Sequence, residues 1–133
     1  MRQGFIKVAA LTPKVKVADT TYNREQICML IDEAQEKSAK ILVFPELCIT
    51  GYTCGDLFYQ ELLLREAKKR AAGDRKIYRA QRLSGVCGTS LEHQGKLYNV
   101  AAAIAQGKVL GLVPKTHIPN YNEFYERRHF DPA

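Results

Sequence analysis

The segment Leu42-Val-Phe-Pro-Glu-Leu-Cys-Ile-Thr-Gly-Tyr52 carries the clearest structural signal in the chain. A short apolar run over residues 41–44 is typical of a strand buried on both faces. Pro45 cannot donate to a sheet's hydrogen-bond ladder, so the strand should end there. Glu46 is therefore predicted at the carboxyl end of a strand, where α/β sheets bind their ligands.

The flanking sequence extends this strand into an α/β arrangement. Residues 5–11 alternate loosely and predict a first strand. A helix is expected over 23–38, because apolar residues recur at helical spacing and Asn23 with Gln26 resembles a capped start. Strand, helix and strand in this order predict a parallel βαβ unit. Asp56 is a suitable N-cap for a second helix over about 57–72.

A second motif follows in the last third of the chain, Val113-Pro-Lys-Thr-His-Ile-Pro-Asn-Tyr-Asn-Glu-Phe-Tyr-Glu126. It is preceded by a predicted hairpin, with strands over 97–105 and 108–113 around a turn at Gln106-Gly107. The sequence 93–96 predicts another turn, and hence a three-stranded meander. The segment 74–91 has few apolar residues, and only 83–89 is predicted as strand. Lys115, like Glu46, should therefore stand just beyond a strand end.

Composition places the chain among ordinary soluble domains. It has 133 residues, 46% hydrophobic and 26% charged, with a net charge of +6. No apolar stretch approaches the roughly 18 residues that span a bilayer, and no signal sequence is evident, so we expect a cytoplasmic protein without membrane contact. The basic residues clustered at 65–82 favour a solvated helix face over a nucleic-acid patch. The four cysteines lack metal-ligand spacing, which predicts reduced thiols and no metal site.

Several residues could carry chemistry. A carboxylate beside an ammonium can act as a general base, although Glu46 could equally brace a loop and Lys115 could point into water. Glu123 could hold the charge of Lys115 in place, or be a solvated loop residue. Tyr121, Phe124 and neighbouring aromatics could wall a small-molecule pocket, or simply pack in a core. The cysteines are poor candidates for a nucleophile: Cys48 is two residues from Glu46 in a loop, where the two side chains need not meet, and Cys87 has no base nearby in sequence.

The motifs resemble a known family. Phe44-Pro-Glu-Leu-Cys-Ile-Thr-Gly-Tyr-Thr-Cys-Gly-Asp-Leu-Phe58 is similar to the first signature of the nitrilase, or carbon–nitrogen hydrolase, superfamily. Its details resemble the glutaminase domain of glutamine-dependent NAD(+) synthetases. So do Gly95-Lys-Leu-Tyr-Asn99, Leu110-Gly-Leu-Val-Pro-Lys-Thr116 and 119–126. The resemblance covers residues 2–131 and is poor over 74–91, where that family has a hydrophobic strand.

The resemblance implies a fold and a set of roles. The fold would be α/β, part of a four-layer αββα sandwich, with residues 1–133 as the N-terminal part of a glutaminase domain. Glu46 would be the general base, Lys115 the cation that stabilises an oxyanion, and Glu123 a supporting glutamate. Tyr52, Tyr121 and Phe124 would shape the glutamine pocket. We expect no cofactor in this chain, because ATP and Mg²⁺ belong to the synthetase domain of such enzymes.

The nucleophilic cysteine of that family lies on a later strand, beyond residue 133. We therefore expect this chain alone to be inactive towards glutamine, whereas the parent would supply ammonia for amidation of nicotinic acid adenine dinucleotide to NAD. The resemblance also implies a homo-oligomer. Two alternatives stay open: a short, non-catalytic nitrilase-like binding protein, and part of a free-standing amidase or carbamoylase.

Overall fold

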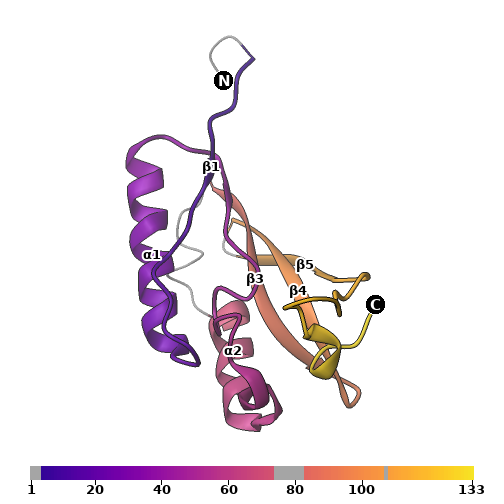
Figure 1. Ribbon diagram of the computed structural model, residues 1–133. Coiled ribbons are helices and arrows are strands. Elements are labelled where there is room, and N and C mark those ends of the chain that lie inside the picture. Colours follow the sequence, from indigo (N-terminus) through magenta and orange to yellow (C-terminus); the bar gives the residue numbers. More distant parts are fainter. Residues whose placement is uncertain (1–3, 74–82, 107) are drawn as a thin grey trace.

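A five-stranded mixed sheet with two helices on one face forms the body of the protein (Figure 1). The computed structural model describes residues 4–73, 83–106 and 108–133. In chain order the elements are β1 (Val8–Ala10), α1 (Thr20–Glu36), β2 (Ile41–Val43), the 3₁₀ helix η1 (Gly55–Tyr59), α2 (Glu61–Gly73), β3 (Ser84–His93), β4 (Lys96–Ala105), β5 (Lys108–Pro114) and the 3₁₀ helix η2 (Glu126–Arg128). The predicted α/β class is confirmed.

The strands lie side by side in the order in which they occur along the chain. β1, β2 and β3 are parallel, and β3, β4 and β5 are antiparallel. The predicted parallel βαβ unit and the three-stranded meander are both confirmed. Gln94 and Gly95 turn between β3 and β4 with φ of 52° and 74°, the left-handed pair that a two-residue hairpin requires. Gly107, predicted in the next turn, lies outside the described residues.

One face of the sheet is buried under α1 and α2. Leu42, Cys87 and Ala102 lie on this face, and all three are buried. Leu42 and Cys87 belong to the main hydrophobic cluster. That cluster also contains Ile27 and Ile31 of α1 and Ala67 of α2. Figure 1 shows both helices on the same side of the strands. Neither helix in the described part of the chain is long and apolar enough to cross a membrane.

The other face of the sheet is apolar and open. The strand register places these residues on it: Val8, Ile41, Val43, Val86, Ala101, Ala103 and Val113. Val43 is 47% exposed and Val113 is 64% exposed. The prediction that residues 41–44 form a strand buried on both faces is therefore wrong for 41–43, because no described element covers this side. We call it the open face.

Two helix starts differ from the predictions. α1 begins at Thr20 rather than near Asn23, because the side chain of Asp19 accepts a hydrogen bond from the backbone N–H of Tyr22 and caps the helix. Asn23 is instead fully buried, and its side chain bonds the backbone of Lys16 and Ile49. Asp56 lies inside η1 rather than at a helix cap, and it pairs with Arg128 at 3.0 Å.

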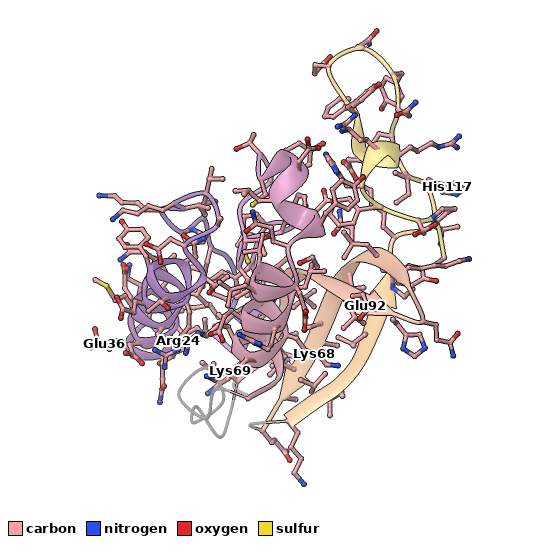
Figure 2. The ribbon with its side chains drawn as sticks, turned by 90° about the horizontal axis from the view of Figure 1, so that it is seen from below. Arg24, Glu36, Lys68, Lys69, Glu92 and His117 are labelled. Atoms are coloured by element: carbon pink, nitrogen blue, oxygen red, sulfur yellow. The ribbon has the colours of Figure 1, made fainter. Side chains whose placement is uncertain are left out.

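The basic side chains predicted as a helix face do lie on α2. Lys68 and Lys69 project from it in Figure 2, and Arg70 pairs with Glu66 of the same helix at 3.4 Å. Residues 74–82, which complete the basic run, lie outside the described residues. His117, on the segment that follows β5, lies on the opposite side of the molecule from Arg24 and Glu36 of α1 (Figure 2).

Candidate active site

Glu46 and Lys115 meet at the edge of the open face. The Nζ atom of Lys115 lies 2.6 Å from Oε1 of Glu46, although 69 residues separate them in sequence. Glu46 follows the end of β2, and Lys115 follows the end of β5. Strands β3 and β4 lie between β2 and β5, so the pairing depends on the side chains reaching across the end of the sheet. The sequence-based expectation that these two residues could meet is fulfilled.

The backbone around Glu46 is tightly constrained. Leu47 is fully buried and adopts a left-handed conformation with φ of 50°, which is uncommon for a residue with a side chain. Behind Glu46, a Cβ atom at Gly88 would lie 2.6 Å from the Cα of Glu46. β3 therefore presses directly against the backbone that carries this carboxylate.

Asn99 binds both members of the pair. Its side-chain amide donates a hydrogen bond to Oε1 of Glu46. Its backbone carbonyl oxygen accepts a hydrogen bond of 2.8 Å from the backbone N–H of Lys115. Asn99 is 3% exposed, so its amide is held in place by packing. Sequence reasoning missed this role. The available signal was its register, because Asn99 and Ala101 lie on the same side of β4.

A second carboxylate completes the ion-pair network. Nζ of Lys115 lies 3.0 Å from Oε2 and 3.2 Å from Oε1 of Glu126. The hydroxyl of Tyr52 donates to Oε1 of Glu126 at 2.8 Å. The side chain of Glu126 is only 6% exposed, so these contacts satisfy a buried charge.

The structure thus places Glu126, rather than Glu123, against Lys115. Glu123 instead lines a hollow of about 180 Å³ beside Tyr52 and Glu126. Both glutamates belong to the motif quoted above, three residues apart. The single helical turn of η2, which starts at Glu126, is what directs the later of the two inwards. A supporting role for Glu123 stays a prediction, and it would act at this hollow and not on Lys115.

Neighbouring charges and burial shift the pKa of the Lys115 ammonium in opposite directions. Partial burial alone would lower the pKa of Lys115, but its hydrogen bonds to Glu46 and Glu126 outweigh this effect and raise the pKa above its ordinary value. Burial, and then the hydrogen bond to Glu126, raises the pKa of Tyr52 well above its ordinary range. The site therefore holds a firmly protonated lysine, a protonated tyrosine and two carboxylates.

Two hollows open beside this network. One of about 390 Å³ lies over the open face and is lined by Phe44, Glu46, Val86, Asn99 and Lys115, among others. Another, of about 570 Å³, is lined by Lys115, His117, Tyr121 and Arg127 with their neighbours. Of the predicted pocket residues, Tyr52 and Tyr121 therefore lie near the network. Phe124 packs edge-on against the ring of Tyr121, with the ring centroids 5.5 Å apart.

The thiols lie elsewhere. Cys48 and Cys87 contact each other on the helix-covered side of the sheet, and Cys54 donates to the carbonyl oxygen of Thr50 at 3.1 Å. Cys28 is half-buried on α1. Across the described residues, no three His, Cys, Asp or Glu side chains form a group that could hold a metal ion. The arrangement offers proton transfer and oxyanion stabilisation to a reacting group on the open side.

Comparisons with known proteins place the chain among relatives of one family. The family model for carbon–nitrogen hydrolases matches residues 7–132. The glutamine-dependent NAD(+) synthetase of Mycobacterium leprae is 38% identical over 132 residues, which are 98% of this chain and 19% of that protein. The chain thus spans about a fifth of the length of this relative.

Solved structures show the same fold. A glutamine-dependent NAD+ synthetase from Acinetobacter baumannii, solved in complex with ADP, superposes with a TM-score of 0.87 at 27% identity, covering 96% of this chain and 24% of that one. An amidase from Nesterenkonia sp. superposes with a TM-score of 0.82 at 22% identity. It covers all of this chain and 50% of the amidase chain, and at that identity the likeness concerns the fold alone.

Proposed function

The chain belongs to the carbon–nitrogen hydrolase family, and on that premise we propose that it forms the N-terminal part of a glutaminase domain. In this proposal the complete enzyme hydrolyses the side-chain amide of glutamine and passes the ammonia to an ATP- and Mg²⁺-dependent synthetase domain that makes NAD. The relatives named as glutamine-dependent NAD(+) synthetases support this substrate and product.

The observation that carries the proposal is the contact between Lys115 and Glu46 at the open hollow. In an ion pair with a purely structural role, the lysine would be expected to contact a single carboxylate. Here Lys115 contacts two carboxylates, the buried Glu126 and the more exposed Glu46, and it lines the 390 Å³ hollow together with Glu46. Glu46 is 41% exposed and Glu126 is 6% exposed, so the two carboxylates have different environments. Of these two carboxylates, the more exposed Glu46 is the one that we propose exchanges a proton with a reacting group.

The chemistry follows from these positions. Glu46 accepts the proton of a cysteine thiol, and the thiolate attacks the amide carbon of glutamine. Lys115 lies where its ammonium can stabilise the oxyanion that forms, and its raised pKa keeps it charged at neutral pH. Glu46 returns its proton to the departing ammonia and then removes one from the water that cleaves the thioester. Asn99 keeps the carboxylate facing the lysine throughout.

The nucleophile in this scheme comes from another part of the enzyme. The thiols of Cys48, Cys54 and Cys87 bond one another or backbone carbonyl oxygens, and none of them bonds Glu46 in the described structure. We propose that further structure packs on the open face and carries the reactive cysteine, because an apolar sheet face with side chains such as Val43 and Val113 is costly to leave in water. This chain alone should therefore release no ammonia from glutamine above background.

The test grafts residues 7–132 in place of the matching segment of the M. leprae relative. We expect the graft to release ammonia from glutamine, and Glu46→Gln to lower that rate by at least about 100-fold, the lower range for a lost general base. Synthesis supplied with free ammonium should continue in the Glu46→Gln graft, which shows that the protein is folded. Glutamine hydrolysis that survives Glu46→Gln would refute the assignment. Faster hydrolysis of simple aliphatic amides than of glutamine would favour an amidase instead.

A further inference from the structure

Two buried thiols that the proposed reaction does not use lie against each other. The Sγ atoms of Cys48 and Cys87 are 3.4 Å apart, although the residues are 39 positions apart in sequence. Cys48 is in the loop that follows β2, and Cys87 is in β3. The two residues are 2% and 5% exposed. A disulfide requires the sulfurs to approach to about 2.05 Å, so closing the bond needs a movement of about 1.4 Å.

The two sulfurs have unequal acidities. The hydrogen bond from the Cys87 thiol lowers the pKa of Cys48 despite its burial, and the same contact, together with burial, raises the pKa of Cys87. The directions of the two shifts make Cys48 the more acidic thiol of the pair. A thiolate beside a second thiol that can resolve its oxidised form is one feature of redox-responsive cysteines, and the other, access to the oxidant, would have to come from local opening here.

The surroundings limit what can reach this pair. Ile27 and Ile31 of α1 and Ala67 of α2 belong to the same buried cluster as the two cysteines. A small uncharged oxidant can enter such a site during local opening, whereas a peptide disulfide is too large. Oxidation there should form a bond within the chain and not between chains.

We propose that Cys48 and Cys87 are a peroxide-oxidised pair that closes into a reversible disulfide. The Cys48 thiolate attacks one oxygen of hydrogen peroxide, the O–O bond breaks and hydroxide leaves, which gives a sulfenic acid on Cys48. The Cys87 sulfur then attacks the Cys48 sulfur and displaces the oxygen as water. Two thiols lose two electrons and two protons, and one peroxide becomes two waters.

The bond would act on the loop that carries Glu46. Cys48 lies two residues after Glu46, and Cys87 precedes Gly88, where an added Cβ atom would lie 2.6 Å from the Cα of Glu46. Drawing the two sulfurs together should therefore move both the loop that carries Glu46 and the part of β3 that packs against it. Control of the active site in this way rests on the proposed function, but formation of the bond does not.

The test is a disulfide map of the 133-residue chain after treatment with hydrogen peroxide, with and without urea. Trypsin releases Cys48 and Cys54 together in residues 41–65 and Cys87 in residues 83–96. In the folded chain we expect these two peptides to be joined, lighter by two hydrogens than their sum, and separated by a reductant. In urea the bond between Cys48 and Cys54 should exceed the Cys48–Cys87 bond by about 16-fold, because loop-closure entropy favours a loop of about 6 residues over one of about 39.

Matched variants sharpen the result. Cys87→Ser should abolish the joined peptides, whereas Cys28→Ser and Cys54→Ser should retain them. The proposal is overturned if peroxide on the undenatured chain yields the Cys48–Cys54 bond, a bond to Cys28, a bond between chains or no bond. Because the readout is a mass and not an activity, failure of the glutaminase proposal leaves this test intact.

Discussion

Gly88 is the position where one added methyl group should disturb the candidate site most directly. A Cβ atom there would lie 2.6 Å from three backbone atoms: Cα of Glu46, N of Leu47 and O of Pro45. Ordinary van der Waals contact begins near 3.4 Å, so these atoms must retreat by about 0.8 Å. None of them is the end of a flexible side chain. Leu47 is fully buried and already in a left-handed conformation, so the loop has little freedom to yield.

We therefore expect Gly88→Ala to destabilise the chain by about 1–3 kcal/mol, the usual cost of overpacking. For 133 residues, the entropy of unfolding near the midpoint is about 0.28 kcal/mol per kelvin, so the melting temperature should fall by about 4–11 °C. Thermal unfolding followed by circular dichroism measures this change.

Gly111→Ala is the matched control. Gly111 lies in the same sheet, and a Cβ atom there meets nothing within 4 Å. Its melting temperature should stay close to that of the original chain. A Gly88→Ala variant as stable as the control would refute the reasoning, since it would mean that the loop carrying Glu46 can move away from β3 at no cost.

Three further changes test other parts of the structure. Asn23→Ala removes three hydrogen bonds of a buried side chain, one to Ile49 that is itself buried and two to Lys16 that are partly buried, and should cost about 2–3 kcal/mol in urea denaturation. Glu126→Gln removes an anion beside Lys115 and Tyr52, so the pKa of each should fall, as followed by NMR and tyrosinate absorbance titrations. Burial lowers the pKa of His129 below its ordinary value, so in the window just below about pH 6.5 the unfolded chain binds more protons and stability falls as the pH falls. His129→Phe should flatten that slope.

Each of these three predictions has a control variant whose result could contradict it. Replacement of the exposed Asn120 by Ala should be near neutral, and a cost equal to that of Asn23→Ala would show that burial is irrelevant. Glu123→Gln should lower the pKa of Tyr52 less than Glu126→Gln does, because it makes no hydrogen bond to that hydroxyl in the described structure. His93→Phe, at an exposed position, should leave the pH dependence of stability in place.

The sequence predicted elements that depend on local patterns. The turn at 93–96 and the strands around it could be read because backbone conformation there is fixed by Gln94 and Gly95 themselves. The start of α1 could not be read as well, because Asp19 and Asn23 are both plausible caps by residue type. In the structure Asp19 caps the helix through the N–H of Tyr22, while the side chain of Asn23 is engaged by the backbone of Lys16 and Ile49.

The candidate site was predictable in its two principal residues and only partly in their partners. Glu46 and Lys115 stand at strand ends, which local sequence marks through Pro45 and Pro114. Glu126 becomes a site residue through a short helical turn that spacing alone does not specify, whereas the alternation of side chains along β4 could have indicated Asn99. The burial of β2 was misjudged for a similar reason, since periodicity reports how apolar a strand is and not what covers it.

The order of the strands also determines the order in which the sheet can form while the chain is being synthesised. Because each strand pairs with the one that precedes it in the chain, the sheet can grow by addition at one edge as the chain emerges. Glu46 is made early, but its contact with Lys115 spans β3 and β4 and closes only after β5 is in place. The network of Glu46, Asn99 and Lys115 is therefore among the last features to assemble, and its presence would report that the whole sheet has formed.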